Sequence, residues 1–209
     1  MRDVNDIIPL GTKKLGRPRA FDCEHVLTAA QEVFWAKGYD GASLDDLTEA
    51  MGINRPSLYG AFGDKKSLFL RVLDFFADGI GSAAIRAFCN ECDIHKAVEQ
   101  FFEVSLECQT HSGSAARGCL LASAGSISAG SVPEACAKLN STLKLTQSMI
   151  EARFNAEIDA GHLPQGFSVT SKAVIMLDLM QAQAQRAAAG EDEAVLAAQI
   201  AWRVSAVLA

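Results

Sequence analysis

The sequence has no long hydrophobic run and no sign of a secretory leader. Charged residues or glycines interrupt every apolar segment of the 209-residue chain before it reaches the roughly 20 residues that a membrane span needs. The chain begins Met-Arg-Asp-Val-Asn-Asp, which lacks the apolar segment of a signal peptide. Six cysteines are scattered without a disulfide framework, so we expect thiols in a reducing compartment. These absences predict a cytoplasmic protein with no membrane partner.

Catalytic motifs are lacking as well. The sequence has no glycine-rich phosphate loop, no His-Glu-x-x-His pair and no Gly-x-Ser-x-Gly nucleophile turn. Cys89-x-x-Cys92-x-x-His95 offers three metal-binding side chains, but a single Cys-x-x-Cys without a second pair is weak evidence for a zinc site. We therefore predict no catalytic residues, no metal and no cofactor. The main alternative class of protein is an enzyme. Binding to promoter DNA would distinguish the two classes, because an enzyme need not bind it.

Excess positive charge is absent overall, yet basic residues gather near the N-terminus. The net charge is −6. Residues 1–71 contain ten Lys or Arg and ten Asp or Glu, whereas residues 72–209 contain nine and fifteen. The cluster comprises Lys13, Lys14, Arg17 and Arg19, with no acid among them. This asymmetry points to nucleic acid as a partner of the N-terminal part.

Strand patterns are nearly absent and helical periodicity is common, which predicts an all-α fold. Residues 1–20 contain two prolines, two glycines and the basic cluster, and indicate a flexible basic arm. Glycines, prolines and capping residues place the helix boundaries. The expected helices cover residues 22–37, 43–51, 54–62, 64–88, 94–110, 115–127, 133–160, 168–188 and 191–208.

Residues 43–66 carry the strongest local pattern. Ser43 with Asp46 three residues later is close to a capping box at a helix start. Gly52 can adopt the positive φ that a tight turn needs, and Pro56 fits only the first turn of the next helix. This spacing is that of a helix-turn-helix, whose second helix lies in the major groove with its first residues toward the base edges.

Several polar side chains in and near this segment suit contacts with DNA. Arg55 can bond a guanine edge with two hydrogen bonds, or hold a phosphate. The others offer hydroxyl, amide or ammonium groups to the sugar–phosphate backbone. The candidate DNA-binding residues are Arg17, Arg19, Ser43, Asn54, Arg55, Ser57, Tyr59 and Lys65. The alternative is a helical packing unit without a role in DNA binding.

A pattern with fixed gaps covers residues 22–73 and resembles the tetracycline-repressor (TetR/AcrR) family of bacterial regulators. It reads Ala30-x3-Phe34-x3-Gly38-Tyr39-x3-Ser43-Leu44-x2-Leu47, then Met51-Gly52-Ile53-Asn54-Arg55-Pro56-Ser57-Leu58-Tyr59-x2-Phe62-x-Asp64-Lys65-x2-Leu68. Leu47-Thr48 departs from the Ile-Ala that is common in the family. The resemblance implies an all-helical homodimer whose C-terminal domain binds an inducer and separates the two DNA-reading heads. It thus predicts a ligand-responsive repressor of a pseudo-palindromic operator.

The resemblance divides the chain into an arm (residues 1–20), a helix-turn-helix DNA-binding domain (residues 21–66) and a ligand-sensing and dimerisation domain (residues 67–209). Gly16-Arg17-Pro18-Arg19 is similar to minor-groove hooks, and the alternative is a solvated tail. An architectural protein that binds random DNA equally well is a second alternative function.

Two apolar stripes predict a homodimer through the helices near residues 168–188 and 191–208, as a four-helix bundle. The first stripe is Val169, Ala173, Met176, Leu177, Met180 and Ala184, and the second is Val195, Ala198, Trp202 and Ala206. The alternative is that both stripes pack inside one subunit.

The ligand pocket is poorly specified by sequence, because apolar helical stripes usually form core. The candidate residues are Phe101, Phe102, Cys119, Met149, Phe154 and Met176. The scarcity of charge favours a small, mostly apolar or electrophilic inducer. Cys119 follows Arg117-Gly118 at an expected helix start, where a cation and the helix dipole favour a thiolate that senses oxidants or electrophiles. The alternative for Cys119 is a small buried hydrophobe.

Overall fold

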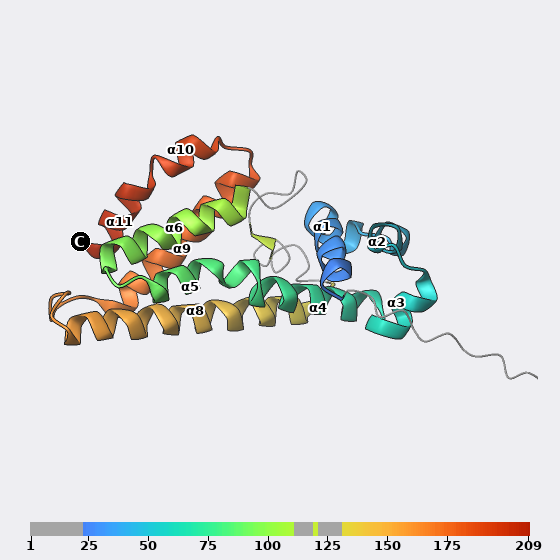
Figure 1. Cartoon of the computed structure of the whole chain (residues 1–209), viewed down its shortest axis with the longest axis horizontal. Helices are drawn as coiled ribbons and strands as arrows, with labels where there is room; N and C mark the ends of the chain where they lie inside the picture. Colours follow the sequence, from blue (N-terminus) through green and yellow to red (C-terminus); the bar gives the residue numbers. More distant parts are fainter. Residues whose placement is uncertain (1–22, 111–118, 121–130) are drawn as a thin grey trace, which may run out of the picture.

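The computed structural model describes residues 23–110, 119–120 and 131–209, and this part of the chain is all-α with no strand. Its shape is elongated, with α1–α3 at one end and α9–α11 toward the other (Figure 1). The helices are α1 (Cys23–Gly41), α2 (Leu44–Met51), α3 (Arg55–Phe62), α4 (Lys65–Asp78), α5 (Ala83–Asn90), α6 (Ile94–Thr110), α8 (Pro133–Asp159), α9 (Val169–Ala188), α10 (Glu193–Ala197) and α11 (Ile200–Leu208). None of the described helices combines the length and apolar character of a membrane span. The expected arm, and most of the helix expected over residues 115–127, lie outside the described residues.

Helices α1–α4 enclose one hydrophobic cluster, here called the N-terminal core. Phe34 of α1 is buried against Phe69 of α4, with ring centroids 4.9 Å apart, and Leu47 and Leu58 are fully buried. Leu58 of α3 therefore points into this core. Because α4 supplies several members of this cluster, the core of the helix-turn-helix extends beyond Lys66.

A single helix over residues 64–88 was expected, and this is wrong. Helix α4 ends at Asp78, a short 3₁₀ turn (Ile80–Ser82) follows, and α5 begins at Ala83. A Cβ atom on Gly81 would lie 3.0 Å from the Phe76 carbonyl oxygen, so a larger residue would force the chain apart by a few tenths of an ångström at this close return. Arg86 donates hydrogen bonds to the carbonyl oxygens of Asp78 and Gly79 at this break, and the Gly79 carbonyl also accepts from the N–H of Ser82 at 3.3 Å.

The helix expected over residues 191–208 is also broken, into α10 and α11. In a continuous helix the Leu196 carbonyl would accept from the N–H of Ile200. It accepts instead from the N–H of Gln199, at 3.2 Å, and from Nη1 of Arg203, at 3.1 Å. The buried guanidinium of Arg203 therefore provides a hydrogen-bond donor for a carbonyl that the break leaves without its α-helical partner.

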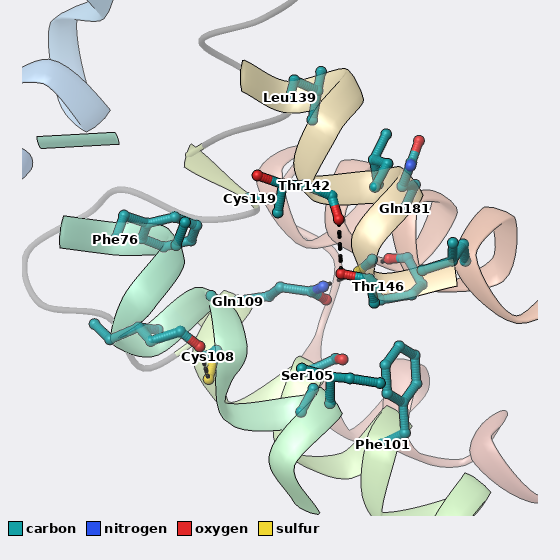
Figure 2. A pocket seen from close by; sticks show the side chains of 18 residues that line it. Phe76, Phe101, Ser105, Cys108, Gln109, Cys119, Leu139, Thr142, Thr146 and Gln181 are labelled. Atoms are coloured by element: carbon teal, nitrogen blue, oxygen red, sulfur yellow. Dashed lines mark hydrogen bonds between the residues drawn. The ribbon is translucent and has the colours of Figure 1, made fainter. Parts of the chain in front are cut away.

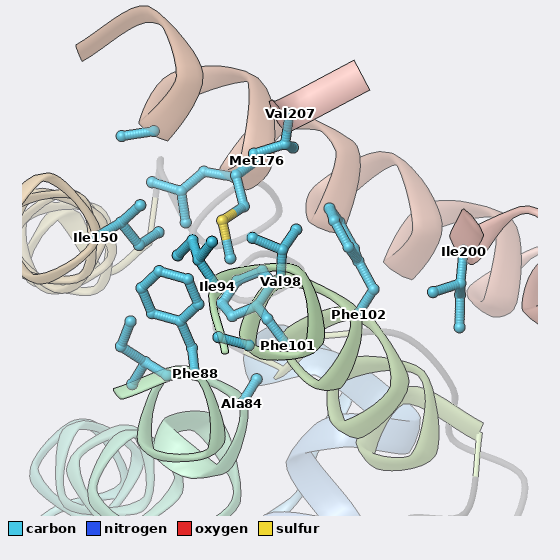
Figure 3. Close-up of a cluster of buried hydrophobic side chains, with 14 of the residues drawn as sticks. Ala84, Phe88, Ile94, Val98, Phe101, Phe102, Ile150, Met176, Ile200 and Val207 are labelled. Atoms are coloured by element: carbon cyan, nitrogen blue, oxygen red, sulfur yellow. The ribbon is translucent and has the colours of Figure 1, made fainter. Parts of the chain in front are cut away.

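A second hydrophobic cluster, here called the C-terminal core, lies among α5, α6, α8, α9 and α11 (Figure 3). Phe88 packs edge-on against Phe101 and Phe154, with the nearer centroid 5.8 Å away. Most of the α9 stripe that was expected at the dimer interface belongs to this core; the buried members are Ala173, Met176, Leu177 and Ala184. The stripe itself is therefore not available to a second subunit, because this face of α9 packs inside its own subunit, and a dimer through the helix stays a prediction.

Arg153 and Glu157 of α8 fasten the loop that follows α5. Arg153 donates to the carbonyl oxygens of Glu91 (2.7 Å) and Cys92 (3.1 Å) and forms an ion pair with Glu157 at 2.6 Å. Nδ1 of His162 lies 2.7 Å from the second oxygen of Glu157. Burial tends to raise the pKa of Glu157, but the hydrogen bonds from His162 and Arg153 outweigh it and lower the pKa.

Candidate nucleic-acid interface and a helical-domain cavity

Helix α2 begins at a capping box. Ser43 Oγ accepts from the N–H of Asp46, and the Asp46 carboxylate accepts from the N–H of Ser43, both at 3.0 Å. Lys37 Nζ lies 2.7 Å from Oδ1 of Asp46. The hydrogen bond from Lys37, followed by those from Ser43, holds the pKa of Asp46 well below its usual value. The capping box expected from the sequence is confirmed.

The turn between α2 and α3 is closed by a left-handed glycine and a second cap. Gly52 has φ 62° and ψ 28°, and its N–H bonds to the carbonyl of Glu49. Asn54 Oδ1 accepts from the N–H of Ser57 at 2.8 Å, and Pro56 occupies the first turn of α3. The two short helices are therefore held rigidly at the spacing of a helix-turn-helix.

The start of α3 presents polar groups to solvent. Asn54 and Arg55 are exposed, Tyr59 is 50% exposed, and Ser57 is half-buried. Arg55 Nη2 lies 2.8 Å from Oδ1 of Asp45 on α2. This surface lies at the end of the molecule away from α9–α11 (Figure 1), so the C-terminal helices leave it uncovered.

The lysines at the start of α4 have different surroundings. Lys65 Nζ lies 4.5 Å from the ring centroid of Tyr39, a cation–π contact. Lys66 Nζ lies 2.5 Å from Oε1 of Glu134 on α8, and this hydrogen bond raises the pKa of Lys66. Lys66 thus ties α4 to α8, and Lys65 is the lysine beside the helix-turn-helix. The other basic candidates, Arg17 and Arg19, lie outside the described residues.

A cavity of about 90 Å³ lies where α4, α5, α6, α8 and α9 meet (Figure 2). No residue that the described part of the chain contributes to its lining is charged. The apolar side chains include Phe76, Ile80, Phe101, Leu143, Leu177 and Met180, and the polar ones are Ser105, Cys108, Gln109, Cys119, Thr142, Thr146 and Gln181.

The structure brings only two of the six expected ligand residues to this cavity, Phe101 and Cys119. The side chains of Phe102, Phe154 and Met176 are fully buried in the C-terminal core instead, and Met149 is 37% exposed on α8. Their place in the core agrees with the general expectation that apolar helical stripes form core.

The cysteines do not form disulfides. Cys108 Sγ donates to the carbonyl of Ile80 at 3.8 Å, and burial, then the charge of Glu107, raises the pKa of its thiol. Arg117 lies outside the described residues, so a thiolate at Cys119 stays a prediction. Within the described residues, no cluster of three or more potential ligands is placed to hold a metal ion, and this includes the Cys89–His95 segment.

Comparison with known proteins finds a sequence match in the helix-turn-helix region and a structural match over most of the chain. The profile of bacterial regulatory proteins of the tetR family matches residues 26–72. A cysteine mutant of the TetR family transcriptional regulator CifR, complexed with 26-bp double-strand operator DNA, has a similar structure, with a TM-score of 0.79 and 28% identity over 91% of this chain and 99% of that one. The chain is therefore similar to bacterial regulatory proteins of the tetR family in sequence over residues 26–72, and in fold over most of its length.

Two of the curated relatives are repressors from Escherichia coli (strain K12). HTH-type transcriptional repressor ComR is 36% identical over 110 residues, 52% of each protein. HTH-type transcriptional repressor BdcR is 47% identical over 70 residues, 34% of each protein. The chain thus spans about half or less of the length of these relatives.

The sequence interpretation missed a buried series of hydrogen-bonded polar side chains. Gln109, Gln183 and Arg203 are 4%, 0% and 2% exposed and join α6, α9 and α11 by hydrogen bonds. The available sign was polar residues within apolar stripes: Gln183 follows Met176 at i+7 on the buried face of α9. A polar side chain buried at that position needs a hydrogen-bond partner, but the periodicity of the sequence does not identify the partner.

Proposed function

We propose that this chain is a DNA-binding transcriptional repressor that binds a pseudo-palindromic operator as a homodimer and is released by a small, mostly apolar or electrophilic ligand. One observation carries the proposal: the capped start of α3 projects Asn54 and Arg55 into solvent beside Tyr59 and Lys65. Such a helix places its first residues at base edges in the major groove. The free backbone N–H groups of its first turn suit a phosphate.

The comparisons support a role in DNA binding. The CifR structure holds operator DNA, and ComR and BdcR are named transcriptional repressors. The family match covers α1–α3 and most of α4, the part that would contact DNA. Arg17 and Arg19 are proposed to extend this contact into the minor groove.

The homodimer is proposed to form through the outer faces of α9, α10 and α11. Val195 and Trp202, from the second expected stripe, are 47% and 59% exposed, and Ala198 between them is exposed as well. Val174 of α9 is 39% exposed, whereas its inner face is buried. Large apolar side chains beside small ones on two helices favour close packing into a four-helix bundle.

The cavity is proposed as the ligand site. It lies against Phe76 of α4, the helix that also completes the N-terminal core, so a ligand there contacts the element that carries the DNA-reading head. Its lining without charged side chains favours an uncharged ligand.

Footprinting of the purified full chain on its own upstream DNA tests the proposal. We expect two protected half-sites whose centres lie about 34–36 Å apart, or a multiple of this distance. Affinity for this site should exceed that for random DNA by roughly 10³ or more. Equal affinity for both would favour the architectural alternative, and no binding of duplex DNA at low salt would refute a role in regulation.

A further inference from the structure

A buried chain of hydrogen bonds runs from the cavity wall to α11. Arg203 Nη1 donates to Gln183 Oε1 at 2.6 Å, and Gln183 Nε2 donates to Gln109 Oε1 at 3.1 Å. Gln109 lines the cavity, whereas Arg203 is 2% exposed and has no ion pair with a carboxylate among the described residues. Within the described part of the chain, the hydrogen bonds of its guanidinium go to neutral oxygens, namely those of Gln183, Leu196 and Gln199.

Arg203 fixes the direction of this chain, because a guanidinium only donates hydrogen bonds. Gln183 must therefore turn its carbonyl oxygen toward Arg203. Its amide nitrogen then faces the carbonyl of Phe102, at 3.3 Å, and Gln109. Gln109 must therefore accept this hydrogen bond with its side-chain oxygen, and its own amide nitrogen is left on the cavity side. The orientation of both amides follows from the chemistry of their partners.

The amide nitrogen of Gln109 has donor capacity to spare. Its one hydrogen bond to the described residues, to the carbonyl of Met180, is long at 3.5 Å, and an amide nitrogen carries two N–H groups. The side chain reaches from α6 toward Thr146 of α8 (Figure 2). Two other donors of the lining are engaged: the Thr146 hydroxyl donates to the carbonyl of Thr142 at 3.0 Å, and the Cys108 thiol donates to that of Ile80.

We propose that Gln109 determines the ligand specificity of the cavity by donating, through Nε2, to an acceptor oxygen of a small uncharged molecule. Gln183 and Arg203 are positioning residues that hold the Gln109 amide in the donating orientation. The ligand class is a compact, mainly apolar molecule with a carbonyl or ether oxygen. Apolar cavities of about 150 Å³ bind benzene, so a cavity of about 90 Å³ suits a ligand of six or so non-hydrogen atoms at most. This inference rests on the proposed function in taking the cavity as the ligand site.

The test uses two probes of equal shape, cyclopentanone and methylenecyclopentane, titrated into the full chain by calorimetry. The quantity measured is the ratio of their affinities, and its change between variants cancels the different hydration of the probes. Gln109→Leu should lower the ketone-to-hydrocarbon ratio about three- to tenfold, the worth of one neutral hydrogen bond. Gln181→Leu is the matched control, since Gln181 also lines the cavity but lies outside the buried chain, and it should keep the wild-type ratio.

A second variant tests the direction of the chain. Gln183→Glu keeps an acceptor for Arg203 but offers only oxygen to Gln109, whose amide must turn over and present its oxygen to the cavity. The ketone preference should then disappear, while cyclopentanol, which can donate, gains several-fold relative to the ketone. A purely structural role of Gln183 would weaken all three probes together.

An unchanged ratio in Gln109→Leu would overturn the proposal, and so would the absence of measurable ketone binding to the wild-type chain. Neither result bears on the operator footprint. Conversely, a chain that discriminates the probes but binds no DNA would overturn the proposed function and leave the specificity of the cavity standing.

Discussion

Arg55 at the start of α3 pairs with Asp45 in the first turn of α2, across the helix-turn-helix. Both Nη2, at 2.8 Å, and Nε, at 3.3 Å, donate to the same Asp45 oxygen. The two side chains are 54% and 78% exposed, so the pair contributes little to stability in water. Its effect is to orient the guanidinium by one edge and leave Nη1 toward solvent, where a base or a phosphate can accept.

Replacing Arg55 tests whether this group reads a base. We expect Arg55→Ala to weaken operator binding by about 1–3 kcal/mol and to relax specificity at one base pair. Binding to operator and to random duplexes would be compared by fluorescence anisotropy. Arg71→Ala, which removes an exposed arginine from α4, is the control and should change operator binding less. If Arg55→Ala weakens all sequences equally, Arg55 contacts phosphate only.

The left-handed turn at Gly52 should respond to substitution through its backbone alone. An added Cβ meets nothing within 4 Å, but φ is 62°, so we expect Gly52→Ala to lower the free energy of unfolding by about 1–2 kcal/mol. Gly60 lies inside α3, also in open space, and Gly60→Ala should raise it by about 0.5–1 kcal/mol. Urea unfolding measures both changes. Shifts of the same sign would contradict this account of the turn.

Deleting residues 1–19 removes the basic cluster of the N-terminal arm. If Arg17 and Arg19 contact phosphates, operator affinity falls and its dependence on salt becomes shallower, because fewer counterions are released. Affinities at several salt concentrations give the slope, which should drop by about 0.9 for each lost contact. An unchanged slope would identify the arm as a solvated tail.

The exposed face of α11 should control the oligomeric state. We expect Trp202→Asp to yield monomers in analytical ultracentrifugation and to lose operator affinity, because a charge would be buried at the interface. Leu145→Asp is the control, since Leu145 on α8 is similarly exposed, at 64%, and should leave the dimer intact. A dimer that survives Trp202→Asp would place the interface elsewhere.

The contacts of Glu157 with Arg153 and His162 predict that the stability of the protein depends on pH. Because the pKa of Glu157 is lowered by folding, its contribution is complete above the ordinary value of 4.5 and is lost as the pH falls through the lower folded value. Glu157→Gln should therefore be less stable than the wild type at neutral pH, and the difference should shrink in acid below about pH 4.5. Thermal melts over this range measure it, with Asp159→Asn as the exposed control on the same helix. A difference that grows in acid would contradict the assignment.

The helix-turn-helix was predictable because its structure is encoded locally. Ser43, Gly52 and Pro56 each permit a narrow range of backbone conformations, and the three agree on one arrangement. The two glycines Gly79 and Gly81 mark the break after α4 in the sequence. They did not predict it, because the need for glycine there depends on how closely the chain returns to Phe76.

The C-terminal part was harder to predict because its structure depends on contacts between distant segments. Periodicity correctly placed an apolar face on α9, but it cannot say whether α6 or a second subunit covers that face. The break between α10 and α11 depends on Arg203, whose partner Gln183 lies twenty residues away. The cavity was missed for the same reason, since its lining comes from helices between α4 and α9.

Phe76 belongs to two environments at once. Its ring packs edge-on against Trp35 of α1, with centroids 5.4 Å apart, and it also lines the cavity. A substitution of Phe76 that adapts the cavity to a new ligand would therefore also disturb the packing of α4 against α1 in the N-terminal core. A change of effector chemistry should arise instead on the α8 wall, at Thr142 and Leu143, which line the cavity without packing against the N-terminal core.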